Sequence, residues 1–187
     1  LTEEALASLR RFCWESTIWK REYENGYMGA FLGDGFACPL LLQIAEELRV
    51  RFPRIFKQHR LMQSWSFKQD SEMKGLNLHA DAAAVNLNFW ITPDEANLDP
   101  DRGGLIVWDK EAPKEWNFKD YNSSKNEPTV REFLRTSGAK AVSIPYRANR
   151  AVLFNSDVFH ETDRATFKTD YTSRRINITL LYGRRSA

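Results

Sequence analysis

The chain has 187 residues, of which 42% are hydrophobic and 13% aromatic, so its composition fits one globular domain and excludes an intrinsically disordered chain. The formal net charge of +2 is too small to indicate nucleic acid or a membrane surface as a partner. No apolar run approaches the ~20 residues of a membrane span, and no signal-like region follows Leu1. We therefore expect a cytoplasmic domain. Because it starts at a residue other than Met, it is compatible with a piece excised from a longer chain.

Residues 1–58 are predicted to form a helical support layer without chemistry of its own. Thr2, followed by two acidic residues, is a typical helix start, and an apolar stripe at helical spacing follows it: Leu6, Leu9, Phe12 and Cys13. Cys38-Pro39 opens a second helix, which Pro53 ends. Between the two helices, Asn25 to Gly35 contains four glycines and is predicted to be a loop.

From Leu61 onward the hydrophobic pattern becomes that of strands. A strand is predicted at Leu61 to Phe67, a hairpin-type connection at Lys68 to Gly75, and a strand around His79. Further strands are expected at Leu105–Trp108, Val142–Ile144, Ala151–Phe154 and Arg175–Tyr182. Helices followed by many short strands predict an α+β protein whose strands form a sandwich or barrel over residues 59–187.

The segment Ala83 to Ile91 alternates strictly, with Val85, Leu87, Phe89 and Ile91 on one face and Asn86, Asn88 and Trp90 on the other. Asparagine is disfavoured in strands. The polar face is therefore either an exposed edge or, as we slightly prefer, an interior wall that faces a site and contacts substrate.

Residues 111–140 form a long polar insertion between strands, with a short helix predicted at Thr129 to Thr136. Excursions of this length are more often functional than decorative. We expect the insertion to be a mobile cover over a binding site, with Trp116 and Tyr121 as candidate substrate contacts. The alternative is a surface insertion without a functional role.

His79 and Asp81 lie two residues apart, so in an extended strand both side chains project from the same face, at a separation that suits one metal ion. Taken alone, the pair could equally be a surface histidine beside a turn-forming aspartate. His160 is expected in the loop that follows the Ala151–Phe154 strand and its turn, and it is the candidate third ligand. Two imidazoles and one carboxylate on one face of iron leave coordination positions open for oxygen chemistry. Asn77 shares the face of His79 and is a further candidate substrate contact, whereas His59 is expected to be a surface residue.

Arg175 lies fifteen residues after His160 and begins the last predicted strand. An arginine there can hold one end of a dicarboxylate through two hydrogen bonds. Its neighbour Arg174 would share the apolar face of Ile176 and Ile178, which should pack on the helical layer, while Arg175 shares the polar face of Asn177. We therefore expect Arg175 to be the anchor and Arg174 to be a solvated surface charge.

Together, His79-x-Asp81, His160 and Arg175-x-Asn177 resemble the Fe(II)- and 2-oxoglutarate-dependent oxygenases. The stretches VNLNFWITP and IPYRANRAVLFNSDVFHETD are similar to prolyl-hydroxylase-like members, and the resemblance spans about residues 61–183. It implies a double-stranded β-helix (jelly-roll, cupin-like) core. It also implies a catalytic group in which His79, Asp81 and His160 bind Fe(II) and Arg175 holds the far carboxylate of 2-oxoglutarate.

The same resemblance implies O2 as the oxidant and hydroxylation of a C–H bond, with release of succinate and CO2. Asn88 and Asn177 are then candidate cosubstrate contacts. The interval between His160 and Arg175 is longer than is usual for prolyl-hydroxylase-like enzymes, so their substrate does not transfer. Leu181 stands where nucleic-acid dealkylases carry a second arginine. The substrate is left open among an amino acid, a peptide or protein and a small metabolite, and the oligomeric state is left open as well.

Two other classes of protein remain as alternatives. One is a non-oxygenase metal enzyme, such as a zinc hydrolase or a cupin-type isomerase, which would have no need of the arginine on the strand. The other is an interaction module, with or without a metal, attached to a repeat protein. Metal content together with 2-oxoglutarate turnover separates these alternatives from an oxygenase.

Overall fold

The computed structural model describes residues 1–23, 26–56, 58–73 and 78–185. Its helices are α1 (Glu3–Glu15), α2 (Pro39–Arg51), α3 (Pro53–Phe56), α4 (Phe118–Asn122) and α5 (Glu127–Thr136). Its strands are β1 (Arg21–Tyr23), β2 (Tyr27–Phe31), β3 (Leu61–Gln69), β4 (Glu72–Met73), β5 (Val85–Trp90), β6 (Leu105–Glu111), β7 (Ala141–Ile144), β8 (Ala151–Asn155), β9 (Val158–Thr162), β10 (Ala165–Thr166) and β11 (Ile176–Tyr182). None of the described helices is long and apolar enough to cross a membrane.

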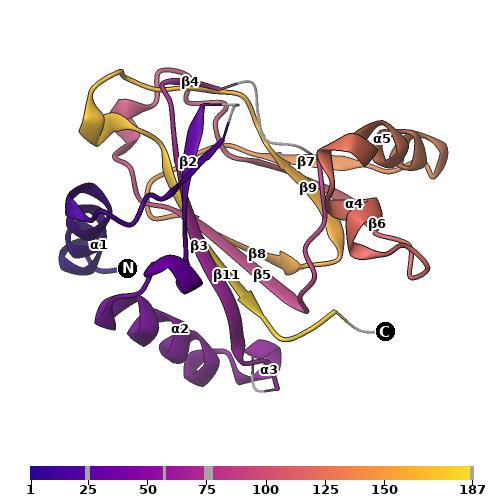
Figure 1. Cartoon of the computed structure of the whole chain (residues 1–187), viewed down its shortest axis with the longest axis horizontal. Coiled ribbons are helices and arrows are strands. Elements are labelled where there is room, and N and C mark those ends of the chain that lie inside the picture. The colour runs from indigo at the N-terminus through magenta and orange to yellow at the C-terminus, as the bar shows by residue number, and fades with distance from the viewer. Residues whose placement is uncertain (24–25, 57, 74–77, 186–187) are drawn as a thin grey trace.

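The strands form two main antiparallel sheets. The larger sheet has the order β1-β2-β3-β11-β5-β8, the smaller has the order β7-β6-β9, and β10 pairs with β4 beside them. Helices α1 and α2 lie outside the larger sheet, whereas α4 and α5 lie at the opposite side of the molecule, beside the smaller sheet (Figure 1). This is the predicted α+β arrangement with a jelly-roll core, built from open sheets rather than from a closed barrel.

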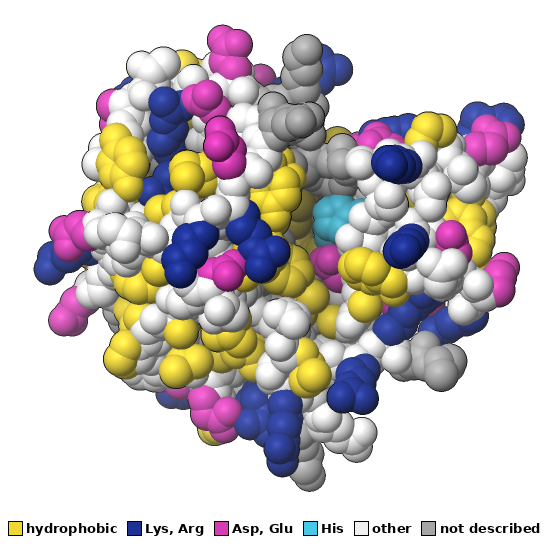
Figure 2. Space-filling view, in the orientation of Figure 1, with side chains coloured by type: hydrophobic (Ala, Val, Ile, Leu, Met, Phe, Trp, Pro, Cys, Tyr) yellow, Lys and Arg dark blue, Asp and Glu magenta, His cyan; other side chains and the backbone are white. Residues whose placement is uncertain are grey.

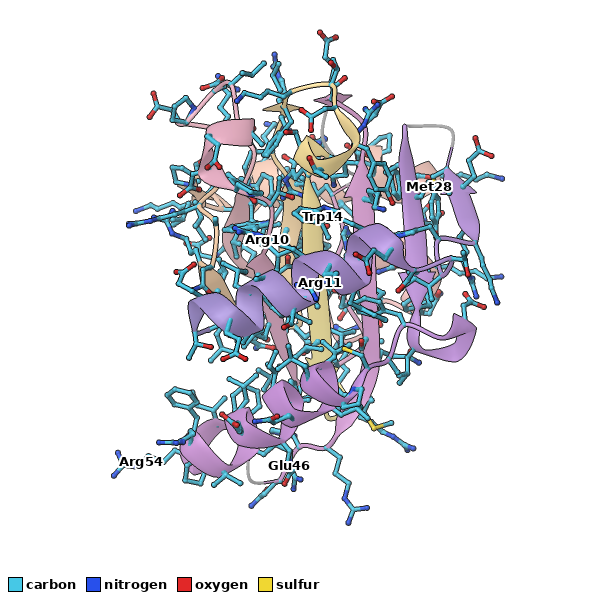
Figure 3. All side chains as sticks on the ribbon, turned by 90° about the vertical axis from the view of Figure 1, so that its left-hand side faces the viewer. Arg10, Arg11, Trp14, Met28, Glu46 and Arg54 are labelled. Atoms are coloured by element: carbon cyan, nitrogen blue, oxygen red, sulfur yellow. The ribbon has the colours of Figure 1, made fainter. Side chains whose placement is uncertain are left out.

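The larger sheet buries one face against the first two helices. Ile176, Ile178 and Leu180 of β11 belong to a core cluster that also contains Leu9 of α1 and Leu41 of α2. The cluster includes Leu87, Phe89 and Ile91 as well, so the predicted alternation around β5 is confirmed. Figure 3 shows α1 crossing this face of the sheet, with α2 below it.

Both long helices begin where the sequence predicts. Thr2 caps α1, and its hydroxyl oxygen accepts a hydrogen bond from the backbone nitrogen of Ala5 at 3.2 Å. Cys38 precedes α2, whose first residue is Pro39. The helix ends at Arg51, and Pro53, predicted to stop it, also begins the short α3.

The loop prediction for Asn25 to Gly35 was wrong, because β2 occupies its centre. This strand pairs with β3, so that Gly29 lies opposite Phe67 and Phe31 opposite Trp65. Two of the glycines do lie in turns, since Gly26 and Gly35 have φ angles of +78° and +103°. Between them, Tyr27 to Phe31 consists largely of residues that a strand accepts. The glycine count hid that strand.

The strand predicted around His79 is reduced to a single pairing, that of His79 with His160. The next two backbone nitrogens find other partners, because Ala80 donates to the carbonyl oxygen of Tyr121 at 3.0 Å and Asp81 to that of Ser156 at 3.1 Å. The insertion and the β8–β9 turn therefore take the place of a neighbouring strand here. Asn77 lies outside the described residues.

The expected loop position of His160 was also wrong, since His160 lies inside β9. The helix predicted in the insertion is α5, which begins two residues earlier than expected. Its Val130 and Leu134 pack in a cluster with Leu78 and Phe159, and this cluster also holds Tyr121. The insertion is thus packed against the segments that carry both histidines.

Candidate metal centre

His79, Asp81 and His160 come together at the inner side of the smaller sheet. One ligand atom from each lies within 4.8 Å of the others, close enough for the three to converge on one cation with small side-chain adjustments. The Nε2 atom of His79 is 3.8 Å from Oδ1 of Asp81, and the Nε2 atom of His160 is 3.4 Å from Oδ2. The backbone pairing of His79 with His160 fixes their two imidazoles side by side, with ring centroids 4.4 Å apart.

The hydrogen bonding of His160 suits a ligand. Its Nδ1 lies 3.1 Å from the carbonyl oxygen of Val158, an acceptor, so Nδ1 carries the proton and donates. The lone pair of Nε2 is then left facing Asp81, as in many metal sites where the second ring nitrogen is held by a carbonyl group. Phe154 packs edge-on against the imidazole, with ring centroids 5.0 Å apart, and restricts its rotation.

Two amides hold the carboxylate of Asp81, which is only 6% exposed. The Nδ2 atom of Asn86 donates to Oδ2 at 2.9 Å, and that of Asn122 lies 3.5 Å from Oδ1 while it also donates to the carbonyl oxygen of Ala80 at 2.6 Å. Burial by itself would raise the pKa of Asp81, but the close approach of His160 and His79 to the carboxylate outweighs it and lowers the pKa. The group is therefore held as the anion, the form that binds metals.

A cavity of about 640 Å³ opens onto this triad. In Figure 2 a histidine side chain is visible at the bottom of a hollow with hydrophobic side chains around it. Besides the triad, the lining residues are Tyr23, Tyr27, Phe31, Gln63, Trp65, Phe67, Ala82, Asn88, Leu105, Phe118, Asn122, Thr162, Asn177, Thr179 and Leu181. The volume suits a small organic ligand.

Arg175 is the buried arginine of the pair, at 1% exposed, while Arg174 forms an ion pair with Asp70 at the surface. The guanidinium of Arg175 donates to the carbonyl oxygens of Gly103 (2.6 Å) and Gly104 (3.4 Å) and to Oε1 of Gln69 (2.9 Å). All of these partners are neutral. Burial lowers the pKa of Arg175 to about 10, so it remains a cation at neutral pH. Within the described residues, this buried charge has no hydrogen-bonded carboxylate.

Gly103 and Gly104 make it possible for their carbonyl oxygens to contact the guanidinium of Arg175. A Cβ atom at Gly104 would lie 1.8 Å from the carbonyl oxygen of Ile144, so only glycine fits between β6 and β7 at this point. Arg175 itself is not among the residues that line the cavity. It lies behind the lining, with Trp90 and Tyr146 each 5.8 Å from its guanidinium carbon.

A row of polar side chains lines the cavity on the strands next to Arg175. The Nδ2 atom of Asn88 donates to the hydroxyl oxygen of Thr179 at 2.8 Å, and Asn177 lies 3.5 Å from Asn88. The Oδ1 atom of Asn177 is buried without a partner in the described part of the chain. Buried polar atoms are rarely left unpaired, and such an atom beside a cavity indicates a ligand or water.

Several predicted site residues lie away from the cavity. Asn86 contacts Asp81 rather than the cavity, and Trp90 is fully buried next to Tyr146. Trp116 packs on Phe133 and Phe159, and Tyr121 is buried under the insertion. None of these four residues lines the cavity.

Sequence reasoning missed two residues of the insertion that do reach the site, Phe118 and Asn122, and the aromatic residues of β1 and β2. The capping box at the start of α4 (Asn117 with Asp120) was a signal for the helix that carries the first two. No comparable local signal marks Tyr23 and Tyr27 as lining residues, because their contact with the cavity depends on the pairing of β2 with β3.

No family model matches the chain, and no curated protein matches it. Solved structures do. HygX from Streptomyces hygroscopicus, with nickel and 2-oxoglutarate bound, has a TM-score of 0.63 at 14% identity, over 98% of this chain and 80% of that one. The alpha-ketoglutarate-dependent carbocyclase SnoK from nogalamycin biosynthesis has a TM-score of 0.64 at 14% identity, over 97% and 76%. A Pseudomonas putida prolyl-4-hydroxylase has a TM-score of 0.55 at 13% identity, over 100% and 89%.

At these identities the likeness concerns the fold. The chain therefore has the double-stranded β-helix fold of the iron- and 2-oxoglutarate-dependent oxygenases, as its sequence motifs led us to expect. Inside that fold, two histidines and one aspartate of this chain meet at a cavity.

Proposed function

We propose that the protein is a non-heme Fe(II)- and 2-oxoglutarate-dependent dioxygenase that hydroxylates a C–H bond of its substrate, with release of succinate and CO2. The observation that supports this most is the triad of His79, Asp81 and His160, with their ligand atoms within 4.8 Å of one another at the bottom of a cavity. Oxygenases of this fold with nickel or Fe³⁺ and 2-oxoglutarate bound are among the structural neighbours.

The residues present fit the proposed group. Two neutral imidazoles and an anionic carboxylate are the donor set that non-heme Fe(II) oxygenases use, and they leave the remaining coordination positions open. The buried cation of Arg175, which has no hydrogen-bonded carboxylate among the described residues, fits the distal carboxylate of a dicarboxylic acid, with the polar row of Asn88, Asn177 and Thr179 beside it. When bound, iron and 2-oxoglutarate would supply the oxidising chemistry with O2.

The chain itself contributes position and charge. Asn86 and Asn122 orient the carboxylate of Asp81, and Val158 holds the imidazole of His160 with its lone pair toward the site. For the cosubstrate to reach Arg175, it would have to displace some of the present contacts of the guanidinium with Gly103, Gly104 or Gln69. Phe118 and Asn122 bring the insertion to the cavity edge, where we propose that residues 111–140 act as a cover.

The test combines metal binding with turnover. The purified protein should bind one Fe(II), or one Ni(II) as a redox-stable substitute, and consume 2-oxoglutarate slowly without substrate. The variants His79→Ala and His160→Ala should lose both properties. His59→Ala is the matched control, because it removes the third histidine, which lies outside the triad, and it should behave as the wild-type protein does.

The possible results separate the alternatives. Metal binding without 2-oxoglutarate turnover would indicate a cupin-type or hydrolytic metal enzyme or a metal-binding interaction module, and the absence of metal binding would indicate a metal-free interaction module. Succinate release across candidate substrates then identifies the substrate, as an increase over the uncoupled rate. A cytoplasmic location stays a prediction.

A further inference from the structure

One side of the cavity is a continuous surface of aromatic rings. It is formed by Tyr23 of β1, Tyr27 and Phe31 of β2, and Trp65 and Phe67 of β3, here called the aromatic wall. All five side chains line the cavity whose other residues include the triad. The function proposed above assigns this wall no role.

Each ring of the wall contacts at least one other ring of the wall. Tyr23 and Tyr27 are stacked, with centroids 4.4 Å apart and planes 8° from parallel. Phe67 meets both edge-on, at 5.9 and 5.1 Å. Phe31 meets Phe67 edge-on at 6.0 Å and lies at 6.1 Å from Trp65 with the planes tilted by 35°. These are preferred aromatic geometries, so the wall is pre-organised before any ligand binds.

The backbone beneath the wall is adapted to it. Gly29 lies in the middle of β2, and a Cβ atom there would come within 2.9 Å of the Phe31 ring, 3.1 Å of the Tyr23 ring and 3.2 Å of the Phe67 ring. The three rings converge over this glycine and could not do so over a larger residue. A glycine in a strand interior is otherwise unfavourable, and it often marks a place of close approach.

Core packing alone does not account for the wall. All five side chains are only half-buried, although rings of this size are the ones that gain most from full burial. Phe118 of α4, which also lines the cavity, is 54% exposed. Contiguous exposed apolar surface on a soluble protein commonly marks a binding site.

The charge of the lining narrows the class of ligand. Among the described residues, the cavity is lined by no lysine, arginine, aspartate or glutamate apart from the aspartate of the triad. Arg21 stacks on Phe31 of the wall and is paired with Asp34 at 2.8 Å. A phosphate or carboxylate group against the wall would lose its hydration without gaining a cationic partner among the described lining residues. An ammonium group would gain only the ring faces, because the described lining offers it no carboxylate outside the triad.

We propose that, in the oxygenase proposed above, the aromatic wall is the substrate-binding surface. We further propose that the substrate is an uncharged small molecule that lays a planar aromatic or fused-ring system on the wall. The cavity places the wall and the triad around one space, so a ring system seated on the wall can present an edge C–H bond to the metal position. The part of this inference that concerns the reaction rests on the proposed function, whereas the part that concerns binding does not.

The test uses metal-free protein and the uncharged dye N-phenyl-1-naphthylamine, whose fluorescence rises on entering an apolar site. Its matched anion is 8-anilinonaphthalene-1-sulfonate, which keeps the same ring skeleton and adds one charge. We expect the uncharged dye to bind at least about tenfold more tightly than the sulfonate. 2-Naphthol should displace the dye better than the cation trimethyl(2-naphthylmethyl)ammonium does.

Two phenylalanine variants locate the dye. Phe67→Leu removes a central ring of the wall but keeps the site apolar, and it should weaken dye binding by about two- to tenfold, the range expected for lost aromatic pairing. Phe52→Leu is the control, because Phe52 lies at the end of α2 and is 51% exposed away from the cavity, and it should bind the dye as the wild type does. If Phe67→Leu does not fold, Tyr27→Leu takes its place.

Equal affinity for the two dyes, stronger displacement by the cation, or equal effects of the two leucine variants would each overturn the proposal. Because the dye is measured without metal or 2-oxoglutarate, a failure here leaves the oxygenase proposal standing. Conversely, if the wild-type protein failed to bind metal, the result of the dye-binding experiment would still stand.

Discussion

The two faces of the larger sheet differ in almost every property, although the same strands supply both. On β11, Ile176, Ile178 and Leu180 are completely buried against α1 and α2. The alternate residues Asn177 and Thr179 line the cavity, with Arg175 buried beside them. One face holds the fold together through apolar contacts, and the other carries polar groups whose partners are incomplete.

On the side of the sheet away from α1 and α2, several polar groups lack complete hydrogen bonding. Oδ1 of Asn86 and Oδ1 of Asn177 are buried without a partner among the described residues, and Arg175 has only neutral partners. Such groups cost free energy in the absence of a ligand. The two faces therefore contribute differently, and substitutions on them should have different consequences: loss of turnover on the cavity side and loss of stability on the helix-facing side.

The largest expected effect is on the cavity side. Asp81→Asn keeps the size and most hydrogen bonds of the side chain but removes the anion that a divalent metal requires. Turnover of 2-oxoglutarate should fall by at least about a hundredfold, while the melting temperature of the metal-free protein should stay close to that of the wild type. A large loss of stability in this variant would break the proposed division between the faces.

The converse substitution is Ile178→Ala on the helix-facing side. Removing a completely buried isoleucine should lower the free energy of unfolding by about 2–5 kcal/mol, measured by urea denaturation, while the folded fraction keeps its affinity for metal. Leu42→Ala is the control, because Leu42 is 51% exposed on α2, and a change within about 0.5 kcal/mol is expected there.

The two adjacent arginines give a sharper comparison. Arg175→Met should raise the 2-oxoglutarate concentration needed for half-maximal turnover by about thirtyfold or more, because a desolvated charge-assisted contact is worth about 2–5 kcal/mol. Arg174→Met should change it little, since the Arg174–Asp70 pair is at the surface. The reverse order, with both variants folded, would remove Arg175 from the cosubstrate site.

The smallest effect concerns Lys68, the exception on the helix-facing side. Its ammonium group donates to the carbonyl oxygen of Cys13 at 3.0 Å and to the hydroxyl of Tyr171 at 2.8 Å, between the rings of Trp19 and Tyr171. Burial lowers the pKa of Lys68 from 10.5 to about 8, although the nearby Cys13 opposes the shift.

Above pH 8 the folded protein releases this proton while the unfolded chain keeps it up to about pH 10.5, so the unfolded state binds more protons in this interval. The free energy of unfolding of the wild type should therefore rise with pH relative to that of Lys68→Met. Urea denaturation of both proteins at pH 7.5 and pH 10 measures the difference. Equal pH dependence would mean that the aromatic rings and hydrogen bonds keep the pKa of Lys68 near its ordinary value.

Much of this arrangement could be predicted because it depends on local pattern. Strand alternation is a property of neighbouring residues, and it correctly assigned Leu87, Phe89, Ile176 and Ile178 to the helix-facing side. Helix capping at Thr2 is equally local. The prediction failed at β2, where the glycine content suggested a loop, and at His160, where the preceding turn suggested one. Both lie in short strands whose stability comes from their partner strands.

The sequence by itself determined which residues can do chemistry and which face of each strand they share, since residue type and the two-residue period are written in the chain. The tertiary structure alone decided that Asn122 reaches Asp81 across 41 positions, and that Tyr23, Tyr27 and Phe31 join Trp65 and Phe67 in one wall. These contacts depend on how strands and an insertion far apart in sequence pack together. That packing follows from the burial of whole surfaces and the pairing of backbones, which no local pattern contains.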